Sequence, residues 1–254
     1  MKDIHEAVKR HHRLVEEKGY EVVMTSLVGS QNYELDIETS DVDTFSFVMP
    51  SFEDLAFARE PVSGEFEVED GKCVYKYIRI ALNLLKKTSP NSIEYFLSYY
   101  QYHNPKYEMI LYSYLGNESY MNSMIHCNHY HMLYAIEGMA RQLTKRNMPA
   151  GKRYSHALRL SSMVDVFTSS IQVANLLLPL PRDLNDARVA KRNTEDYMCA
   201  YYDEECAKIA QKLSNVRANF VITDYLKKTE KEGIRLIELF QKDLMSTYLK
   251  QLMK

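Results

Sequence analysis

The stretch that decides the fold runs from Val28 to Asp43 and reads VGSQNYELDIETSDVD. It follows residues 21–28, EVVMTSLV, whose β-branched side chains predict a buried strand that ends at a turn at Gly29. A glycine there lets backbone N–H groups approach an anion closely, and Ser30 adds a hydroxyl donor beside it. If Gln31 opens a helix, the free N–H groups of its first turn favour a phosphate at the same place. The stretch therefore predicts an anion site at the end of the first strand.

Two carboxylates, Asp41 and Asp43, flank Val42 at the start of a second predicted strand, residues 42–49, which Pro50 closes. Residues i and i+2 of a strand point to the same face, so both carboxylates should project together and repel each other. A divalent cation relieves that repulsion, and Mg²⁺ accepts one or two carboxylates together with substrate phosphates and water. We therefore expect a Mg²⁺ site (or Mn²⁺ in its place) at Asp41 and Asp43, although a short acidic pair can also cap a turn.

The rest of the chain predicts an α+β fold, in which a small mixed sheet is followed by a helical C-terminal bundle. Residues 2–18 have the pattern of an amphipathic helix, and residues 66–77 that of a hairpin with a type I′ turn at Asp70–Gly71. From Ile78 onward the apolar spacing is helical, with breaks expected at residues 149–151, at residues 179–181 and at Gly233. We place a domain boundary near residue 116, which separates residues 1–115 from residues 116–254.

A second candidate feature is a basic stretch in the helical half. Between Gly138 and Val164 there is no Asp or Glu, and there are six basic residues: Arg141, Lys145, Arg146, Lys152, Arg153 and Arg159. Lys152, His156 and Arg159 share one face of a helix that should start after Gly151. Such a face could contact a triphosphate or a nucleic acid, and its alternative is an ordinary solvated basic face.

At these residues the sequence resembles a known family. GSQNYELDIETSDVD is similar to the GS…DxD signature of the DNA polymerase β nucleotidyltransferase superfamily, in particular to predicted nucleotidyltransferases of bacteria and their phages. The similarity extends over residues 50–54, 76–79 and 91–96, and GKRYSHALRL at residues 151–160 resembles a Lys/His/Arg helix motif of the same proteins. It covers roughly the first 100 residues well and the helical half only in patches.

The resemblance implies a Mg²⁺-dependent transfer of a nucleoside monophosphate from an NTP to an acceptor hydroxyl, with release of pyrophosphate. Gly29 and Ser30 would hold the β- and γ-phosphates, and Asp41 and Asp43 would bind the metal and serve catalysis. Lys152, His156 and Arg159 would neutralise phosphate charge. The sequence does not name the acceptor, which could be RNA or another molecule.

One departure from the family pattern concerns its third carboxylate. The second arm of the hairpin, KCVYKYIR, has Val74 and Tyr77 where relatives tend to carry acidic residues, and we expect Val74 to be the one that faces Asp41 and Asp43. Three acidic residues could substitute: Glu67, Glu69 and Asp70. If none does, the alternative is a catalytically silent protein that binds nucleotide or RNA and keeps the fold.

Bulk composition limits the remaining classes. A net charge of −2, with 26% charged and 46% hydrophobic residues, argues for a globular protein and against a general nucleic-acid coat. The N-terminus lacks the pattern of a signal peptide, and the apolar residues 171–180 are too short to span a bilayer. The four cysteines show no CxxC pairing, which predicts reduced thiols and a cytoplasmic location.

Two further clusters receive structural interpretations. The segment His126–His131 contains three histidines and a cysteine, but the spacing does not match a zinc motif, so we expect histidines on a helix surface. The 20 tyrosines could stack bases, yet such residues more often line the seams between packed helices.

Overall fold

The computed structural model describes residues 3–59, 63–145, 147–169, 176–178, 180–193 and 198–253. Arg146 of the basic stretch lies outside the described residues, as do parts of the apolar stretch and of the break expected at residues 179–181. The chain is 65% helical and 12% strand, which confirms the α+β class. It forms two compact units: the first comprises residues 1–29, 41–127 and 228–254, and the second residues 30–40 and 128–227. The division differs from a single boundary near residue 116, because residues 30–40 join the second unit and the C-terminal helix returns to the first.

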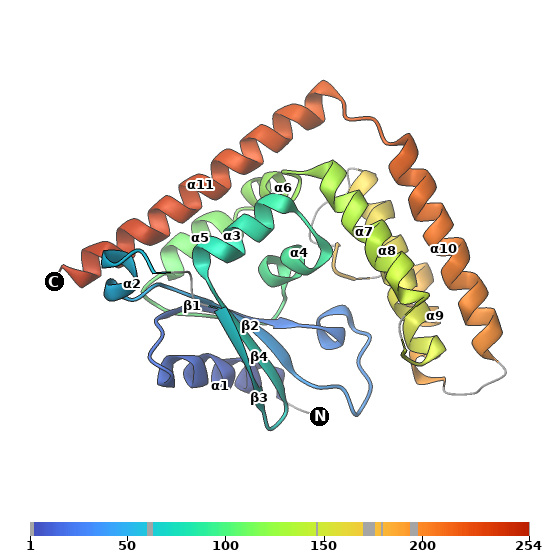
Figure 1. Cartoon of the computed structure of the whole chain (residues 1–254), viewed down its shortest axis with the longest axis horizontal. Coiled ribbons are helices and arrows are strands. Elements are labelled where there is room, and N and C mark those ends of the chain that lie inside the picture. The colour runs from blue at the N-terminus through green and yellow to red at the C-terminus, as the bar shows by residue number, and fades with distance from the viewer. Residues whose placement is uncertain are drawn as a thin grey trace. The chain divides into compact units, whose positions relative to one another are not determined.

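The first unit contains one five-stranded mixed sheet, with strand order β3-β4-β2-β1-β5 (Figure 1). Its strands are β1 (Val22–Val28), β2 (Asp43–Val48), β3 (Ser63–Val68), β4 (Gly71–Tyr77) and β5 (Gln101–His103). β2 and β4 pair in parallel and the other pairs are antiparallel, so the expected mixed sheet is confirmed. β5 was not expected, because residues 101–103 lie in a region whose apolar spacing is helical.

Helices cover both faces of this sheet. They are α1 (Ile4–Glu17), α2 (Phe52–Ala56), α3 (Ile78–Lys87), α4 (Pro90–Leu97), α5 (Glu108–Leu115), α6 (Glu118–Ile125) and most of α11 (Asp224–Leu252). On one face, the buried His11 of α1 lies 2.9 Å from the hydroxyl of Thr44 in β2. On the other face, Phe45 of β2 stacks on Tyr95 of α4 at 3.8 Å between ring centroids. Successive residues of β2 therefore point to α1 and to α4 in turn.

The hairpin of β3 and β4 is confirmed, but the type I′ turn is wrong. Val68 pairs with Gly71, so the loop consists of Glu69 and Asp70, and neither has the positive φ that a type I′ turn requires. Gly71 serves another purpose, because a Cβ there would lie 2.3 Å from the carbonyl oxygen of Val42. The missing side chain lets the hairpin pass directly beside the backbone between the two candidate carboxylates, where Val42 N–H donates to the carbonyl of Asp70 at 2.8 Å.

The break expected at Gly233 is also wrong, because this glycine lies inside α11. A Cβ at Gly233 would lie 2.1 Å from the carbonyl oxygen of Ser123 and 2.7 Å from the Cβ of Cys127. The glycine therefore allows α11 to pack closely on the end of α6, which brings together residues far apart in the sequence.

The second unit is a helical group formed by α7 (His129–Leu143), α8 (Ala150–Thr168), α9 (Pro181–Arg192) and α10 (Cys199–Asn219) (Figure 1). The short 3₁₀ helix η1 (Ser30–Tyr33) belongs to it as well. α8 is buried on most of its circumference and packs against the other three helices.

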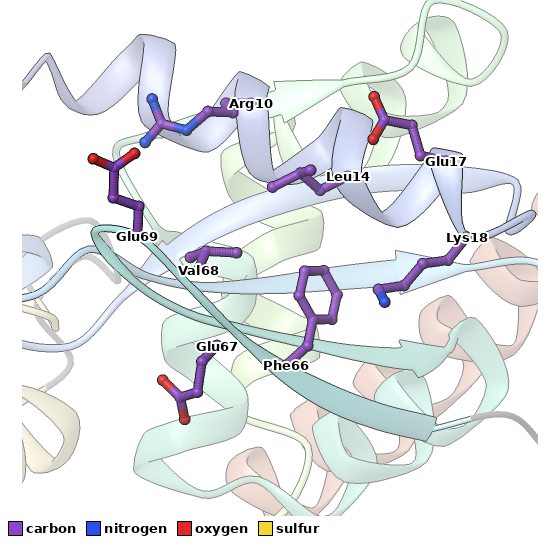
Figure 2. Close-up of a pocket in the computed structure, with 8 residues that line it drawn as sticks. All are labelled: Arg10, Leu14, Glu17, Lys18, Phe66, Glu67, Val68 and Glu69. Atoms are coloured by element: carbon purple, nitrogen blue, oxygen red, sulfur yellow. The ribbon is translucent and has the colours of Figure 1, made fainter.

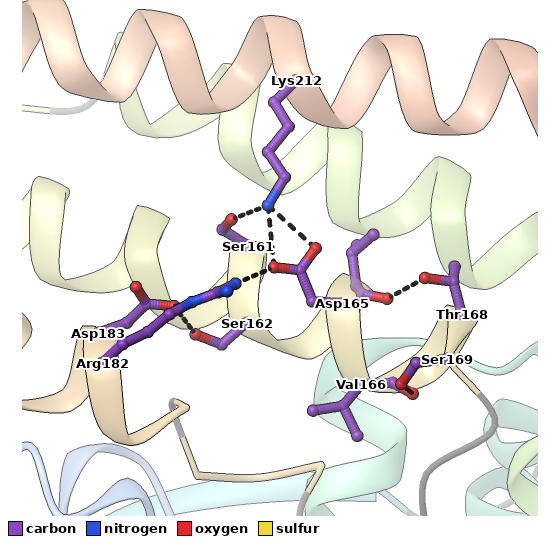
Figure 3. A network of polar contacts seen from close by, with 10 residues as sticks. Ser161, Ser162, Asp165, Val166, Thr168, Ser169, Arg182, Asp183 and Lys212 are labelled. Atoms are coloured by element: carbon purple, nitrogen blue, oxygen red, sulfur yellow. Dashed lines mark hydrogen bonds and ion pairs between the residues drawn. The ribbon is translucent and has the colours of Figure 1, made fainter.

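A polar network fastens α8 to its neighbours (Figure 3). Lys212 of α10 donates to both carboxylate oxygens of Asp165 at 3.0 Å and to the hydroxyl of Ser161 at 2.9 Å. From α9, Arg182 binds the same Asp165, while Asp183 accepts a hydrogen bond from Ser162. The network holds α8, and with it the basic residues that it carries, in a fixed position in this unit.

Two general expectations can be compared with the structure. All four cysteines are free, in agreement with reduced thiols. Among the described residues, no helix has both the length and the apolar character that crossing a bilayer demands.

Candidate functional site

The carboxylate of Asp43 stands at the start of β2, opposite Val28 at the end of β1. Asp41 precedes the strand, so the alternation of side chains along a strand does not set its direction, contrary to our expectation. The two carboxylates nevertheless lie close enough to interact. Partial burial raises the pKa of Asp43, and the charges of Asp41 and Glu67 raise it further, while the backbone N–H and the ammonium of Lys72 oppose the shift. Burial is the largest of these effects, and the nearby negative charges add to it.

Gly29 adopts a φ of +87°, a left-handed conformation that favours glycine. Its Cβ would meet the carboxylate of Asp43 only at 3.7 Å, so the backbone conformation and not the available space calls for glycine. The N–H of Gly29 donates to the carboxylate of Glu94, which is buried on α4. The expectation that this N–H is open to a phosphate is therefore wrong in this conformation, because an acidic side chain of the chain itself occupies it.

The register of β2 and β4 shows which residue stands at the position where the family pattern has its third carboxylate. Thr44 faces α1 and pairs with Cys73, so Asp43 and Phe45 face the other way together with Val74, the partner of Phe45. Tyr77 pairs with Val48 and shares the α1 face. Val74 is thus the apolar residue on the face of Asp43, as predicted.

Glu67 is one of two acidic residues, with Glu65, that the hairpin places on the face of Asp43. It pairs with Lys72, whose backbone N–H donates to Asp43 at 3.1 Å. Figure 2 shows Phe66 and Val68 pointing toward α1, whereas Glu67 projects from the other side of the hairpin. Of the three expected substitutes, Glu67 is therefore the one whose charge acts on Asp43.

The other two substitutes point elsewhere. Asp70 accepts a hydrogen bond from Arg10, and its carboxylate lies 3.1 Å from Nε2 of His11; both partners are on α1. Glu69 lies with Arg10, Leu14 and Lys18 along a cleft of about 430 Å³ between α1 and the hairpin (Figure 2). Asp70 thus anchors α1 to the hairpin turn.

Residues 30–40, which the sequence places between Gly29 and Asp41, pack in the second unit. Arg188 of α9 donates to the carbonyl of Glu34 at 2.9 Å and also pairs with its carboxylate. Lys191 of α9 donates to the carbonyl of Leu35, a buried residue. The hydroxyl of Ser30 lies 3.4 Å from that of Ser40, so the two ends of the segment approach each other.

Arg159 is the most unusual residue of the basic stretch. It is only 4% exposed, and its guanidinium carbon lies 4.0 Å above the ring of Tyr33, which is 3% exposed. Its Nε and Nη1 are buried and have no hydrogen-bond partner in the part of the chain that the structure describes. A buried guanidinium with unmet donors is able to bind an anion, because leaving such groups unsatisfied costs about 1–3 kcal/mol each.

The other two residues of the predicted face differ from Arg159 in exposure. Lys152 is exposed and His156 is half-buried. Lys152 also acts on Lys191: burial, together with the charge of Lys152, lowers the pKa of Lys191 to about 8. Positive charge therefore accumulates around this end of α8. The sequence singled out neither Tyr33 nor Lys191, since a ring and a lysine on distant segments leave no pattern that links them to α8.

The remaining candidates behave as structural residues. His126 and His129 are buried, so the expected surface position is wrong, and the ring of His129 lies 5.1 Å from that of Phe167. Among the described residues, no group of three or more His, Cys, Asp or Glu side chains is arranged to hold a metal ion. The carboxylate pair fits a Mg²⁺ ion that arrives with a nucleotide, because such an ion takes one or two carboxylates and completes its shell with phosphates and water.

No family model matches the chain, and no curated protein matches it.

Proposed function

We propose that the chain is a Mg²⁺-dependent nucleotidyltransferase. An acceptor hydroxyl would attack the α-phosphate of an NTP, forming a new P–O bond while pyrophosphate leaves with the electron pair of the broken bond. The observation that carries the proposal is the pair of carboxylates Asp41 and Asp43 beside Gly29, where partial burial, with a smaller contribution from the charge of Asp41, raises the pKa of Asp43. The free thiols support a cytoplasmic location.

Each group has a role that follows from its chemistry. Asp41 and Asp43 would hold Mg²⁺, which neutralises phosphate charge when it is bound. Arg159 would donate its unmet N–H groups to phosphate oxygens, with Lys152 and His156 as further cationic groups. Gly29 and Ser30 would bind the β- and γ-phosphates, and for Gly29 this requires that Glu94 release the backbone N–H.

A second candidate function is nucleotide or RNA binding without turnover. Two observations favour it: Glu94 occupies the Gly29 N–H, and Val74 supplies no carboxylate on the face of Asp43. A site short of one ligand for a second metal, or of a base for the acceptor hydroxyl, loses rate before it loses nucleotide binding.

One experiment tests the metal role. Wild type, Asp41→Asn and Asp224→Asn are melted with Mg²⁺ and with each NTP in turn, and Asp224 is the control because its side chain is 98% exposed. We expect a Mg²⁺-dependent rise in melting temperature with NTP for wild type and Asp224→Asn, and none for Asp41→Asn. An equal rise in all three proteins would show that the carboxylates do not bind the metal.

A second measurement separates the two candidate functions. Pyrophosphate release is followed with all four NTPs and Mn²⁺ under conditions in which NTP binding is saturated. Release that Asp41→Asn abolishes supports the transferase, whereas binding without release supports the silent protein. No NTP-dependent stabilisation of wild type would exclude both.

A further inference from the structure

The outer face of α7 carries residues that the proposed function does not use. Tyr130, Tyr134, Gly138, Arg141 and Lys145 follow one another at intervals of three or four residues, so they lie along one side of the helix and of the turn after it. The rings of Tyr130 and Tyr134 are 50% and 58% exposed. We call these five residues the α7 face.

Arg217 of α10 lies beside both tyrosines. Its Nη1 is 3.4 Å from the hydroxyl of Tyr130, and its guanidinium carbon is 5.7 Å from the ring centroid of Tyr134. Arg217 and Arg141 both pair with Glu137, a buried residue beneath them, and Arg141 also donates to Ser214 at 3.0 Å. The two arginines are thus held in place by one carboxylate, while the side chain of Arg141 stays 63% exposed.

The charge along this surface has one sign. Residues 138–145 of the α7 face contain no Asp or Glu, and neither do residues 207–219 of α10. Glu137 neutralises only one of its two arginines, and the exposed Lys145 adds a further positive charge. A partner for this surface must therefore be anionic.

Gly138 leaves room for a partner in the middle of the face. A Cβ at this position would find nothing within 4 Å, so the described part of the chain offers no packing reason for glycine. Glycine inside a helix costs about 0.5–1 kcal/mol relative to alanine. The space at Gly138 is therefore open, and a ligand can approach the helix backbone there.

We infer that the α7 face binds single-stranded nucleic acid. Unpaired bases stack on Tyr130 and Tyr134, and the phosphates between them run past Gly138 to Arg141 and Lys145. Two separate exposed rings with a guanidinium beside them fit bases, whereas an apolar protein partner would bury the charges of Arg141, Arg217 and Lys145 with the single carboxylate of Glu137 to balance them. The inference does not involve Asp41 or Asp43, so it stands or fails apart from the proposed nucleotide chemistry.

The test measures the anisotropy of a fluorescently labelled oligouridylate with the full chain at low salt. Wild type should bind, and Tyr130→Ala combined with Tyr134→Ala should weaken binding about tenfold or more, because stacking on an aromatic ring carries much of the affinity for each base. The double Tyr→Phe variant should bind within about threefold of wild type, since the rings remain. Tyr112→Ala is the matched control, because Tyr112 on α5 is 75% exposed and lies outside the face.

Two further variants distinguish this surface from general charge attraction. Arg141→Gln with Lys145→Gln should reduce the slope of log affinity against log salt by about 0.7 for each phosphate that the protein no longer neutralises. Gly138→Glu should keep or raise the melting temperature yet abolish binding, since the side chain fits into open space but places an anion on the path of the strand. The same oligonucleotide annealed to its complement should bind more weakly, because its bases are stacked within the duplex.

Three results would overturn the inference. They are no binding by wild type at up to roughly 100 μM protein, equal binding by the double Tyr→Ala variant, and equal binding of the duplex. A preference for an anionic protein over the oligonucleotide would assign the face to a different partner.

Discussion

The guanidinium of Arg159 lies 4.0 Å above the ring of Tyr33, and both residues are almost fully buried. Tyr33 belongs to the segment between Gly29 and Asp41, whereas Arg159 is in the middle of α8. The ring makes a cation–π contact with the face of the guanidinium. The N–H groups at its edge, on Nε and Nη1, have no hydrogen-bond partner among the described residues. This arrangement costs stability unless an anion binds.

The first prediction concerns Arg159→Met, which keeps the length of the side chain and removes its charge. Without ligand, we expect unfolding free energy equal to or above that of wild type, since removal of the unmet donors (about 1–3 kcal/mol) offsets removal of the cation–π interaction with the ring (up to about 2 kcal/mol). With Mg²⁺ and ATP, the variant should lose about 1.5–3 kcal/mol of binding free energy, while adenosine binding stays unchanged.

Titration calorimetry and urea unfolding check both parts, with Arg13→Met on the exposed side of α1 as the control. Equal losses for ATP and adenosine would mean that Arg159 does not contact the phosphates. A large loss of stability without ligand would mean that the guanidinium is satisfied within the fold.

The second prediction compares two helix glycines. Gly233→Ala should lower the unfolding free energy by about 1–3 kcal/mol, because the new Cβ would lie 2.1 Å from the carbonyl oxygen of Ser123. Gly138→Ala should raise it by about 0.5–1 kcal/mol, because no atom lies within 4 Å of its new Cβ. Urea midpoints of the two variants should therefore move in opposite directions, and a shift of both in the same direction would contradict the packing described for α11.

Gly71 and Gly233 show which features of the fold the sequence alone does not predict. Local patterns correctly predicted α1, β1, β2 and the β3–β4 hairpin, because apolar spacing and turn residues act over short distances. At Gly71 and Gly233 the sequence shows only the glycine, and a turn or break is the usual reason for it. The actual reasons, close approach to Val42 and to Ser123, depend on tertiary packing that no local pattern contains.

In the candidate site, too, some features follow from local sequence and others depend on tertiary packing. The proximity of Asp41 and Asp43 could be predicted because they are neighbours in the sequence, whereas their role as metal ligands stays a prediction. The pairing of Glu94 with Gly29 could not, since it depends on where α4 crosses the end of β1. The stacking of Arg159 on Tyr33 likewise requires that residues 30–40 pack against α8 and α9.

The third prediction concerns acid stability. Burial, together with the nearby His103, lowers the pKa of His12 to about 4, whereas the unfolded chain titrates near its ordinary value of 6.5. Above pH 6.5 both states are neutral at this position, and as the pH falls to about 4 only the unfolded state gains the proton. The folded state therefore loses up to about 3 kcal/mol of relative stability over that window.

His12→Asn can keep the hydrogen bond to Thr25, which lies 3.1 Å from Nδ1, and has no proton to gain. Its unfolding free energy should fall about 3 kcal/mol less than that of wild type across the same window. Urea unfolding at a series of pH values measures the difference, and His5→Asn at an exposed position of the same helix is the control. Parallel pH profiles for wild type and His12→Asn would show that His12 does not resist protonation.

The last prediction decides between enzyme and silent binder, and it rests on Val74 and Glu67. Both share the face of Asp43, but Val74 is on β4, the strand next to β2, whereas Glu67 is one strand further away. A carboxylate at position 74 would stand on the strand adjacent to that of Asp43, where it can supply a metal ligand or a base for the acceptor hydroxyl. We expect slow pyrophosphate release by wild type with Mn²⁺, faster release by Val74→Asp, and slower release by Glu67→Gln if Glu67 partly fills the role. Val74→Asn is the control, because it introduces the polarity without the charge and should not raise the rate. If wild type turns over rapidly and Val74→Asp abolishes that turnover, the third carboxylate comes from elsewhere, and Glu67→Gln then shows whether it comes from β3.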